Sequence, residues 1–421
     1  MTMQIIALGL LIGAIAIGFI KKINVGIAAF GLVLLLALIG GLKLKVIFAG
    51  FPTKLFITLL GTMFFFALLQ ENKTLELLSQ KIIAAVGKNA FLIPIILYVT
   101  AYALSAAGPG AISAQAVTIL FAVTLAVQMK VDPLLLATPA FLGAVGGTVS
   151  PIALTGIIIS DLFAAQNISV PNSQWILLFG ITAVNFLCAL VTYIWFKGYR
   201  LSPDDTIRSE SLPAFNNSQK MGLASLLFLV CAVVLLKWDV GLVSFTLGFV
   251  LVLFGAANEQ KAIKLIQWNV LILISGVSVL MNVTQELGGI ALLSNMLASV
   301  MNKATAPSVM ALTGGILSWF SSANGVVFPT LIPTLPRIAQ QLGSGMPGVM
   351  EMTMGIVGAA TIAGISPLST GGSLILAVYS QEARCDVKEQ QKLFARCFIL
   401  SFCFVAFVAV IAAFIFKPIC G

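Results

Sequence analysis

The chain has 421 residues, of which 60% are hydrophobic and only 9% are charged. Soluble globular proteins carry about a quarter charged residues, so this composition excludes a soluble protein and predicts a helical one embedded in a lipid bilayer. The net charge of +9 comes without a basic stripe or an aromatic platform. Basic loops at a membrane surface explain that charge better than a nucleic-acid partner does. The sequence has no His, no nucleophile–base pair and no metal-like Cys spacing, so we expect no enzymatic activity.

Taken in chain order, each half of the sequence shows the same succession of elements. Two apolar spans come first, then a third span, then a helix of mixed polarity that we expect to lie along the membrane interface. In the first half these elements cover residues 3–20, 23–42, 55–69 and 72–86, and in the second half residues 221–236, 240–257, 270–283 and 286–301. A polar stretch separates the halves, so we predict one repeat at 1–200, a cytoplasmic linker at 201–219 and a second repeat at 220–421.

Identical residues recur at a nearly constant offset in the two halves. The pairs 215 positions apart include Lys22 and Lys237, Gly26 and Gly241, Gly61 and Gly276, Gln70 and Gln285, and Glu71 and Glu286. Internal repeats of this kind are typical of transporters, which hold the substrate where the halves meet.

The second part of each half contains apolar runs that are interrupted in the middle. Small residues and proline break a first run at 105–110 and a second at 146–151, and the other half has matching breaks at 321–325 and 363–372. We interpret the first run of each half as a re-entrant hairpin and the second as a broken transmembrane helix. With a closing span, each half has five spans and one hairpin, an odd number of crossings. The two repeats must therefore have inverted topology.

The Lys and Arg residues test the orientation. When both termini are placed outside, most of the 23 Lys and Arg residues fall inside, as the positive-inside rule requires. Lys43, Lys45 and Lys54 fall outside and argue the other way. We therefore predict a multi-pass protein with both its N-terminus and its C-terminus outside.

Non-helical backbone at membrane depth survives only where protein covers it or a cavity surrounds it, so the four breaks predict a binding site. Helix N-termini there can bind an anion, and carbonyl and hydroxyl oxygens can bind Na⁺. The residues predicted to bind substrate are Ser105, Gly108, Gly110, Thr155, Ser322, Asn324, Gly325, Thr370 and Gly371. Those predicted to bind sodium are Ser105, Ser113, Thr148, Ser150, Ser321, Asn324, Ser366 and Ser369. Gly156 and Gly372 belong to the same breaks.

Ionisable side chains are missing from the predicted mid-membrane region. A proton-driven carrier usually keeps such groups there, so their absence favours Na⁺ as the coupling ion, with no transition metal. Glu71 and Glu286 lie at the ends of the third spans, where we expect interfacial caps. Arg337 lies about 18 Å along a helix from Gly325, so we expect it to be an interfacial anchor.

The motifs at the breaks resemble a known group of transporters. Ser-Ala-Ala-Gly-Pro-Gly at 105–110, Gly-Gly-Thr-Val-Ser-Pro at 146–151 and Ser-Ser-Ala-Asn-Gly at 321–325 are similar to the ion transporter superfamily. Within it the chain most resembles the malonate-type dicarboxylate carriers, which are related to the divalent anion/sodium symporters. Those symporters carry Ser-Asn-Thr at each hairpin tip. Here Ala106 and Ala107 replace the amide and the hydroxyl, which fits a smaller or differently shaped anion than the C4 and C6 acids typical of the symporters.

The resemblance implies an elevator mechanism in the inner (plasma) membrane of a bacterium. A transport domain at 90–165 and 305–380 would slide against a scaffold of the remaining spans, and the scaffold would form a homodimer. The implied substrate is a small dicarboxylate, malonate or a C4 acid, carried with Na⁺. Other hypotheses remain: a carrier of sulfate, a monocarboxylate or arsenite, a cation/proton antiporter, and a membrane subunit that transports nothing.

Overall fold

The computed structural model describes residues 2–84, 90–201, 213–383, 387–414 and 416. Within these residues the chain forms helices and no strand. Seven of the described helices are long and apolar enough to cross a membrane. The prediction of an all-α polytopic membrane protein is therefore confirmed. The predicted linker lies mostly at 202–212, and the two chain ends at Met1 and at 417–421, all outside the described residues.

The first half of the described chain consists of short and long helices in the predicted order. They are α1 (Thr2–Lys21), α2 (Val25–Ile39), α3 (Leu44–Ala49), α4 (Thr53–Glu71), α5 (Thr74–Ala84), α6 (Ile93–Ala106), α7 (Gly110–Gln128), α8 (Pro133–Gly147), α9 (Leu154–Ala165) and α10 (Ser173–Trp195). The helices stop at the two predicted breaks, between α6 and α7 and between α8 and α9. The short helix α3 was not predicted.

The second half follows the same order. It contains α11 (Asn217–Val234), α12 (Val240–Leu253), α13 (Glu259–Leu265), α14 (Trp268–Glu286), α15 (Gly289–Ser299), α16 (Ala306–Phe320), a π-helical turn (Ala323–Val327), α17 (Phe328–Leu331), α18 (Leu335–Leu342), α19 (Gly345–Ile362), α20 (Thr370–Ala383) and α21 (Val387–Phe414). The unpredicted helix α13 occupies the place that α3 has in the first half. Pro329, Pro333 and Pro336 interrupt the leg that corresponds to α7, because proline has no N–H to continue a helix.

Local sequence explains several helix ends. The side chains of Asn24 and Asp239, which occupy equivalent positions, accept hydrogen bonds from the first turns of α2 and α12. Asp132 caps α8 in the same way, and Pro133 follows at the first helical position, where its missing N–H costs nothing. These caps fix where the apolar helices begin, and so they fix the depth of the breaks that follow.

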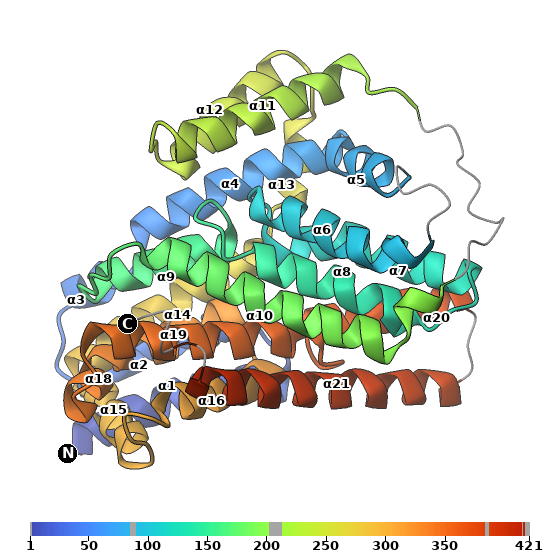
Figure 1. The fold of residues 1–421 in the computed structure, drawn as a ribbon. Helices are drawn as coiled ribbons and strands as arrows, with labels where there is room; N and C mark the ends of the chain where they lie inside the picture. The colour runs from blue at the N-terminus through green and yellow to red at the C-terminus, as the bar shows by residue number, and fades with distance from the viewer. Residues whose placement is uncertain (1, 85–89, 202–212, 384–386, 415, 417–421) are drawn as a thin grey trace.

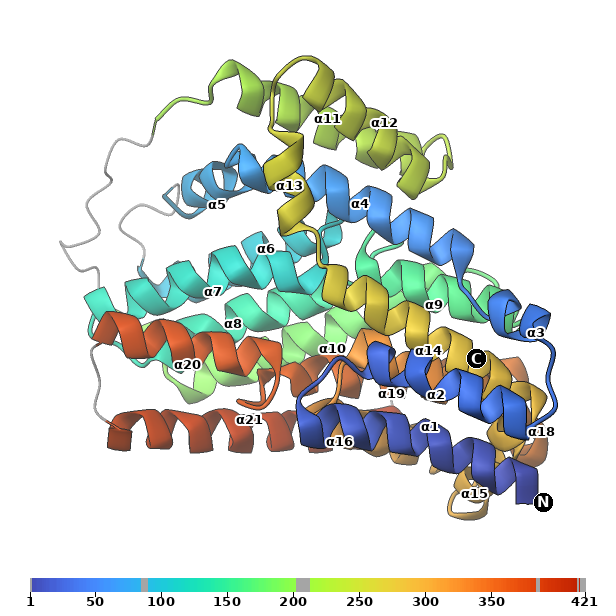
Figure 2. The ribbon, with the colours of Figure 1, turned by 180° about the vertical axis from the view of Figure 1, so that it is seen from behind.

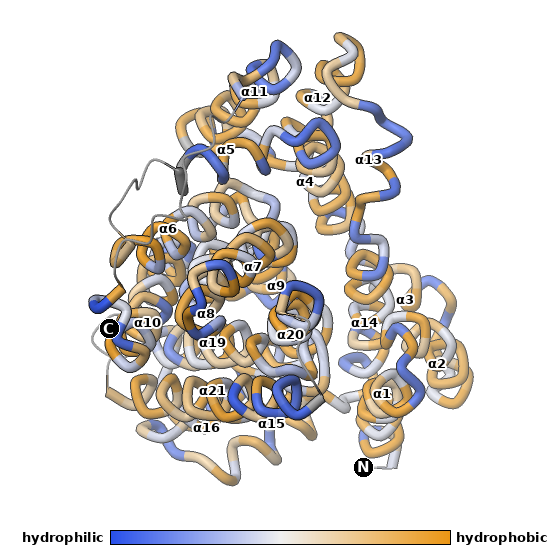
Figure 3. Tube along the Cα trace, turned by 90° about the vertical axis from the view of Figure 1, so that its right-hand side faces the viewer, coloured by the Kyte–Doolittle hydropathy of each residue, from blue (hydrophilic) through white to orange (hydrophobic). Residues whose placement is uncertain are grey.

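The helices are arranged in two bodies. Helices α6–α10 and α16–α21 share one hydrophobic core, which we call the core bundle (residues 90–195 and 306–414). Helices α1–α4 and α11–α14, which we call the wall (residues 2–71 and 217–286), contribute most of two further apolar clusters. One of these clusters also includes side chains of the core bundle such as Leu104 and Ile158, so the wall packs directly on it. Figure 1 and Figure 2 show α11 and α12 at one edge of the molecule and α1 and α2 at the other. Viewed along the helices, the wall stands beside the core bundle as a column (Figure 3).

The wall is held together by two equivalent glycine contacts. Helix α2 packs on α14 through Gly26 and Gly276, and α12 packs on α4 through Gly241 and Gly61. A Cβ atom at Gly276 would lie 2.1 Å from the carbonyl oxygen of Gly26, and one at Gly61 would lie 2.4 Å from that of Gly241. Small residues let membrane helices approach closely, so each half of the chain packs its second helix on the third span of the other.

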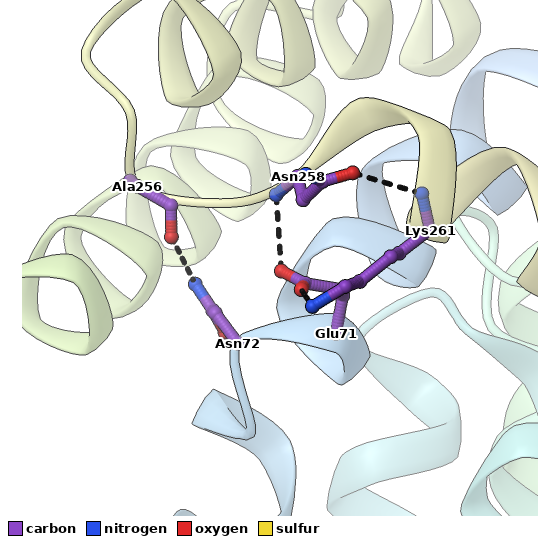
Figure 4. A network of polar contacts seen from close by, with 5 residues as sticks. All are labelled: Glu71, Asn72, Ala256, Asn258 and Lys261. Carbon is purple, nitrogen blue, oxygen red and sulfur yellow. Dashed lines mark hydrogen bonds and ion pairs between the residues drawn. The ribbon is translucent and has the colours of Figure 1, made fainter.

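Glu71 caps a neighbouring helix, as the sequence predicts. Its carboxylate accepts a hydrogen bond of 3.0 Å from the backbone N–H of Asn258 and lies 3.4 Å from the Lys261 ammonium, where α13 begins (Figure 4). Asn72 donates to the Ala256 carbonyl beside it. The end of α4 and the beginning of α14 thus lie on one face of the wall, which we call the Glu71 face.

Candidate functional site

The four helix interruptions of the core bundle meet at one cavity of about 250 Å³. Its lining comes from both halves of the chain and from all four interrupted segments. The residues are Ala111, Ile112, Gln115, Phe141, Val145, Thr148, Thr155, Ser318, Phe320, Ser321, Ser322, Ala323, Asn324, Ala360, Thr361, Gly364, Leu368, Ser369, Thr370 and Gly371. The volume is below the roughly 300–1,000 Å³ of pockets for drug-sized ligands, so the cavity suits a small solute.

A chain of hydrogen bonds crosses the cavity wall from one half to the other. Thr155 donates to the side-chain oxygen of Asn324 at 2.9 Å, although the two residues are 169 positions apart. The hydroxyls of Thr148 and Thr155 are 3.1 Å apart. Because the Thr155 proton goes to Asn324, Thr148 is the donor in that pair. The amide nitrogen of Asn324 then has no partner among the described residues and is available to a ligand.

The break between α8 and α9 is closed by hydrogen bonds within its own backbone. The N–H groups of Thr155 and Gly156 both donate to the Thr148 carbonyl, at 3.1 and 3.2 Å. Gly156 makes this turn possible, because a Cβ atom there would lie 2.1 Å from the Ser150 carbonyl oxygen. The first donors of α9 are therefore already used within the protein.

The corresponding break of the second half, between α19 and α20, leaves the first residues of α20 facing the cavity. Its Gly372 has the same role as Gly156, since a Cβ atom there would lie 2.2 Å from the Ile365 carbonyl oxygen. Thr370 and Gly371, the first residues of α20, line the cavity. The first N–H groups of a helix have no partner within it, so α20 presents free donors and a partial positive charge. This helix N-terminus is the place in the site best suited to an anion.

Among the described residues, no ionisable side chain lines the cavity. Phe141 forms an apolar part of its surface and packs on Gly371, where a Cβ atom would lie 2.4 Å from the ring. The electrostatics of the site therefore depend on amides, hydroxyls and helix ends. These groups can bind an anion, but they cannot neutralise its charge.

The structure brings together part of the predicted site. The predicted residues that line the cavity are Thr148, Thr155, Ser321, Ser322, Asn324, Ser369, Thr370 and Gly371. Gly108 and Gly110 form the first hairpin tip with φ angles of +141° and +74°, conformations that favour glycine. Gly325 is buried in the second tip, beside α14.

Four predicted sodium ligands lie elsewhere. Ser105 is fully buried beside Gly147, and its hydroxyl has no hydrogen-bond partner in the described structure. Ser113 instead accepts a hydrogen bond from Gln267 of the wall at 3.2 Å. Ser366 is buried and accepts from the Leu368 N–H at 3.3 Å. Ser150 lines a different cavity, described below.

Sequence reasoning missed three polar residues that line the cavity. Ser318 and Thr361 bond to backbone carbonyls of the core bundle, whereas Gln115 has no recorded partner among the described residues. Gln115 belongs to α7, the second leg of the first hairpin. A long amide in that apolar run, just beyond the tip, is a signal that could have identified it.

A larger cavity of about 510 Å³ lies between the core bundle and the wall. Lys54, Thr58 and Asp239 line it from the wall, and Ser150 and Asp161 line it from the core bundle. We assign the binding site to the smaller cavity, because only there do the helix breaks of both halves converge. Of the four breaks, the one between α8 and α9 is the one that contributes residues to the lining of the larger cavity.

Arg337 does not reach the cavity. Its guanidinium donates to the Asn295 side chain of α15 at 3.1 Å, as does Gln341 at 2.6 Å. This bonding agrees with an anchoring role and leaves the site without a cation.

Interrupted helices around an uncharged polar cavity define a helical membrane protein of the transporter class. Residues 1–148 match the sequence profile of a family described as the N-terminus of the dicarboxylate carrier protein MatC. The resemblance to the malonate-type dicarboxylate carriers is thus confirmed for that part of the chain, and it points to transport. No curated protein matches the sequence.

A solved structure shares the fold. The YdaH transporter of Alcanivorax borkumensis, described as having an unusual topology, superposes with a TM-score of 0.58 at 13% sequence identity. The alignment covers 90% of this chain and 88% of that one. At this identity the likeness concerns the fold and says nothing about the substrate.

Proposed function

We propose that the protein is a secondary active transporter that carries a small dicarboxylate, such as malonate or a C4 acid, together with Na⁺. The observation that carries this proposal is the convergence of four helix interruptions, two from each half, on one small polar cavity. The carrier family matched by residues 1–148 supports a dicarboxylate as the substrate.

The cavity favours an anion and requires a partner for it. The α20 N-terminus and the Asn324 amide supply donors for a carboxylate. A dianion in this site would meet no positive side chain, and an uncompensated charge away from water is costly. Co-bound cations remove that cost, which supports coupling to Na⁺.

The oxygens for Na⁺ lie beside the substrate cavity. Ser105 has a fully buried hydroxyl with no partner in the described structure, and it lies beside Gly147, the residue that precedes Thr148. Together with the unwound carbonyls of the breaks they form a donor set that suits this hard cation. In the second half, Ser321, Asn324 and Ser369 offer corresponding oxygens. Bound Na⁺ supplies positive charge to the site, and these residues hold the hairpin and the break together around it.

Two inverted repeats in a symmetric arrangement would place their hairpin tips against equivalent residues of the wall. The two tips contact non-equivalent residues, which supports a core bundle that is displaced along the wall. Gly108 lies against Phe66 of α4, and Gly325 lies against Leu273 of α14. Under the 215-residue offset, the equivalent of Phe66 is Met281, so symmetric halves would place Gly325 there. Leu273 and Met281 are eight residues apart, or about 12 Å along a helix. The core bundle therefore sits about 6 Å from the symmetric position, toward the Glu71 face.

The larger cavity agrees with this displacement. Leu273 is covered by the second hairpin tip, whereas its equivalent Thr58 faces the cavity of about 510 Å³. A shift of about 12 Å in the opposite direction would bring Gly108 from Phe66 to Thr58 and fill that space. Two such states related by sliding are what an elevator mechanism requires, with the core bundle carrying the cavity and the wall standing still.

The predicted transport domain at 90–165 and 305–380 remains a proposal, and we extend it. Helices α10 and α21 share the hydrophobic core of the hairpins, so we expect them to move with it. The outer faces of α1, α2, α11 and α12 carry exposed apolar side chains such as Phe30, Leu38 and Phe249, which suit lipid or the wall of a second copy. We propose a homodimer through the wall. The positive-inside rule favours an orientation with the Glu71 face in the cytoplasm, and we propose this orientation in a bacterial inner membrane.

Uptake into proteoliposomes tests the function. We expect labelled malonate or succinate to accumulate when an inward Na⁺ gradient is present and to equilibrate slowly when choline replaces Na⁺. Equal uptake in both conditions would refute sodium coupling. Uptake of sulfate or a monocarboxylate, with no response to dicarboxylates, would refute the substrate class, and proton movement without any organic anion would indicate an antiporter.

A further inference from the structure

Gln115 is a long polar side chain of the cavity that the rest of the described structure leaves without a hydrogen-bond partner. It lines the cavity together with Ala111 and Ile112, which lie one helical turn before it on α7. Only 4% of Gln115 is exposed, and no hydrogen bond to its amide is recorded within the described residues. Its amide reaches the cavity, where a ligand that offers it a hydrogen-bond partner can take the place of water.

The cavity thus has two free amides, one from each hairpin. Asn324 belongs to the second hairpin, and its nitrogen is free because its oxygen accepts from Thr155. Gln115 belongs to the first hairpin, whose tip residues Ala106 and Ala107 carry no polar side chain. Gln115 lies farther from its hairpin tip than Asn324 does, and its side chain is one methylene longer. Its amide can therefore supply the hydrogen-bond donor that the first tip lacks.

We propose that Gln115 binds the second carboxylate of the substrate while the Asn324 amide and the α20 N-terminus bind the first. This inference rests on the proposed function and makes Gln115 a specificity residue for anions with two carboxylates. A monocarboxylate leaves the Gln115 amide unsatisfied, so the site discriminates against it. The length of the Gln side chain also selects the distance between the two carboxylates.

Binding to the purified chain in Na⁺ tests this role. The ligands are malonate, succinate and propionate, and the readouts are the half-saturating concentration and the rise in melting temperature. Gln115→Leu should raise the half-saturating concentration of malonate about tenfold or more and leave that of propionate within about twofold of wild type. The matched control is Gln128→Leu at the exposed end of α7, which should change neither.

Gln115→Asn keeps the amide and withdraws it by one methylene group. We expect this variant to shift the preference from malonate toward succinate, a change that a merely structural role would not produce. The melting temperature of each variant without ligand shows whether it folds like wild type.

The outcomes separate the two proposals. If wild type binds malonate and Gln115→Leu binds it equally well, the role of Gln115 is wrong and the proposed function stands. If the loss is the same for malonate and propionate, Gln115 only supports the shape of the cavity, and the inference also fails. If wild type binds neither dicarboxylate, the proposed function and the inference fall together.

Discussion

The proposed sliding of the core bundle makes a quantitative prediction that cysteine cross-linking can test. Gly108, at the first hairpin tip, lies against Phe66 in this structure. In the opposite state that we propose, it would lie against Thr58. Phe66 and Thr58 are eight residues apart on α4, so the tip travels about 12 Å. A disulfide requires Cα atoms about 4.4–6.8 Å apart, so the tip cannot be close enough to both positions at once.

The experiment uses a chain without its native cysteines, Cys188, Cys231, Cys385, Cys397, Cys403 and Cys420. Ala107→Cys, next to Gly108, is paired either with Phe66→Cys or with Thr58→Cys. We expect each pair to cross-link under an oxidant, each in its own state. A Na⁺ gradient and substrate should change the yields of the two products in opposite directions. Each single-cysteine variant serves as a control for non-specific oxidation.

Transport in the cross-linked protein is the second readout. Uptake by the Phe66→Cys and Ala107→Cys pair should stop on oxidation and return on reduction, because the bond holds the tip in one state. The reduced pair must still transport, which shows that the fold tolerates loss of the Phe66 ring. Undiminished uptake by fully oxidised protein, or a Thr58 pair that never forms while uptake continues, would refute the sliding motion.

Three further predictions concern the site itself. Ser105→Ala removes a buried hydroxyl without a partner, so it should not lower the melting temperature in choline. It should abolish most of the rise in melting temperature that Na⁺ causes, and an unchanged rise would exclude Ser105 as a sodium ligand. Asn324→Ala removes the hydrogen bond from Thr155, so it should destabilise the protein by about 1–3 kcal/mol and greatly reduce uptake. Uptake at the wild-type rate would show that Asn324 is not part of the binding site. Gly156→Ala and Gly372→Ala should each impair folding or uptake, because the added Cβ atom would lie 2.1 or 2.2 Å from a backbone carbonyl oxygen of the break. The control Gly13→Ala, whose Cβ atom would have nothing within 4 Å, should behave like wild type. Equal thermal unfolding and uptake in all three variants would contradict the close packing at the breaks.

The sequence determined the class of protein and the positions of the helix interruptions. Apolar runs set the spans, and Gly, Ser and Pro stop helices through local backbone effects that need no tertiary contact. For this reason the ends of α6 at Ala106 and of α8 at Gly147 agree with the predicted breaks. The small helices α3 and α13 escaped prediction, because seven or fewer residues carry too little periodicity.

The tertiary structure decided which predicted residues meet. Ser113 and Ser150 look like Ser321 and Ser369 in sequence, yet helix packing turns the first two toward the wall and the last two toward the cavity. The bond from Thr155 to Asn324 joins positions 169 residues apart, which no local pattern specifies. The contacts of Gly108 with Phe66 and of Gly325 with Leu273 are likewise set by packing between segments far apart in the chain. A repeated sequence by itself does not specify such unequal contacts, because equivalent residues would be expected to meet equivalent partners.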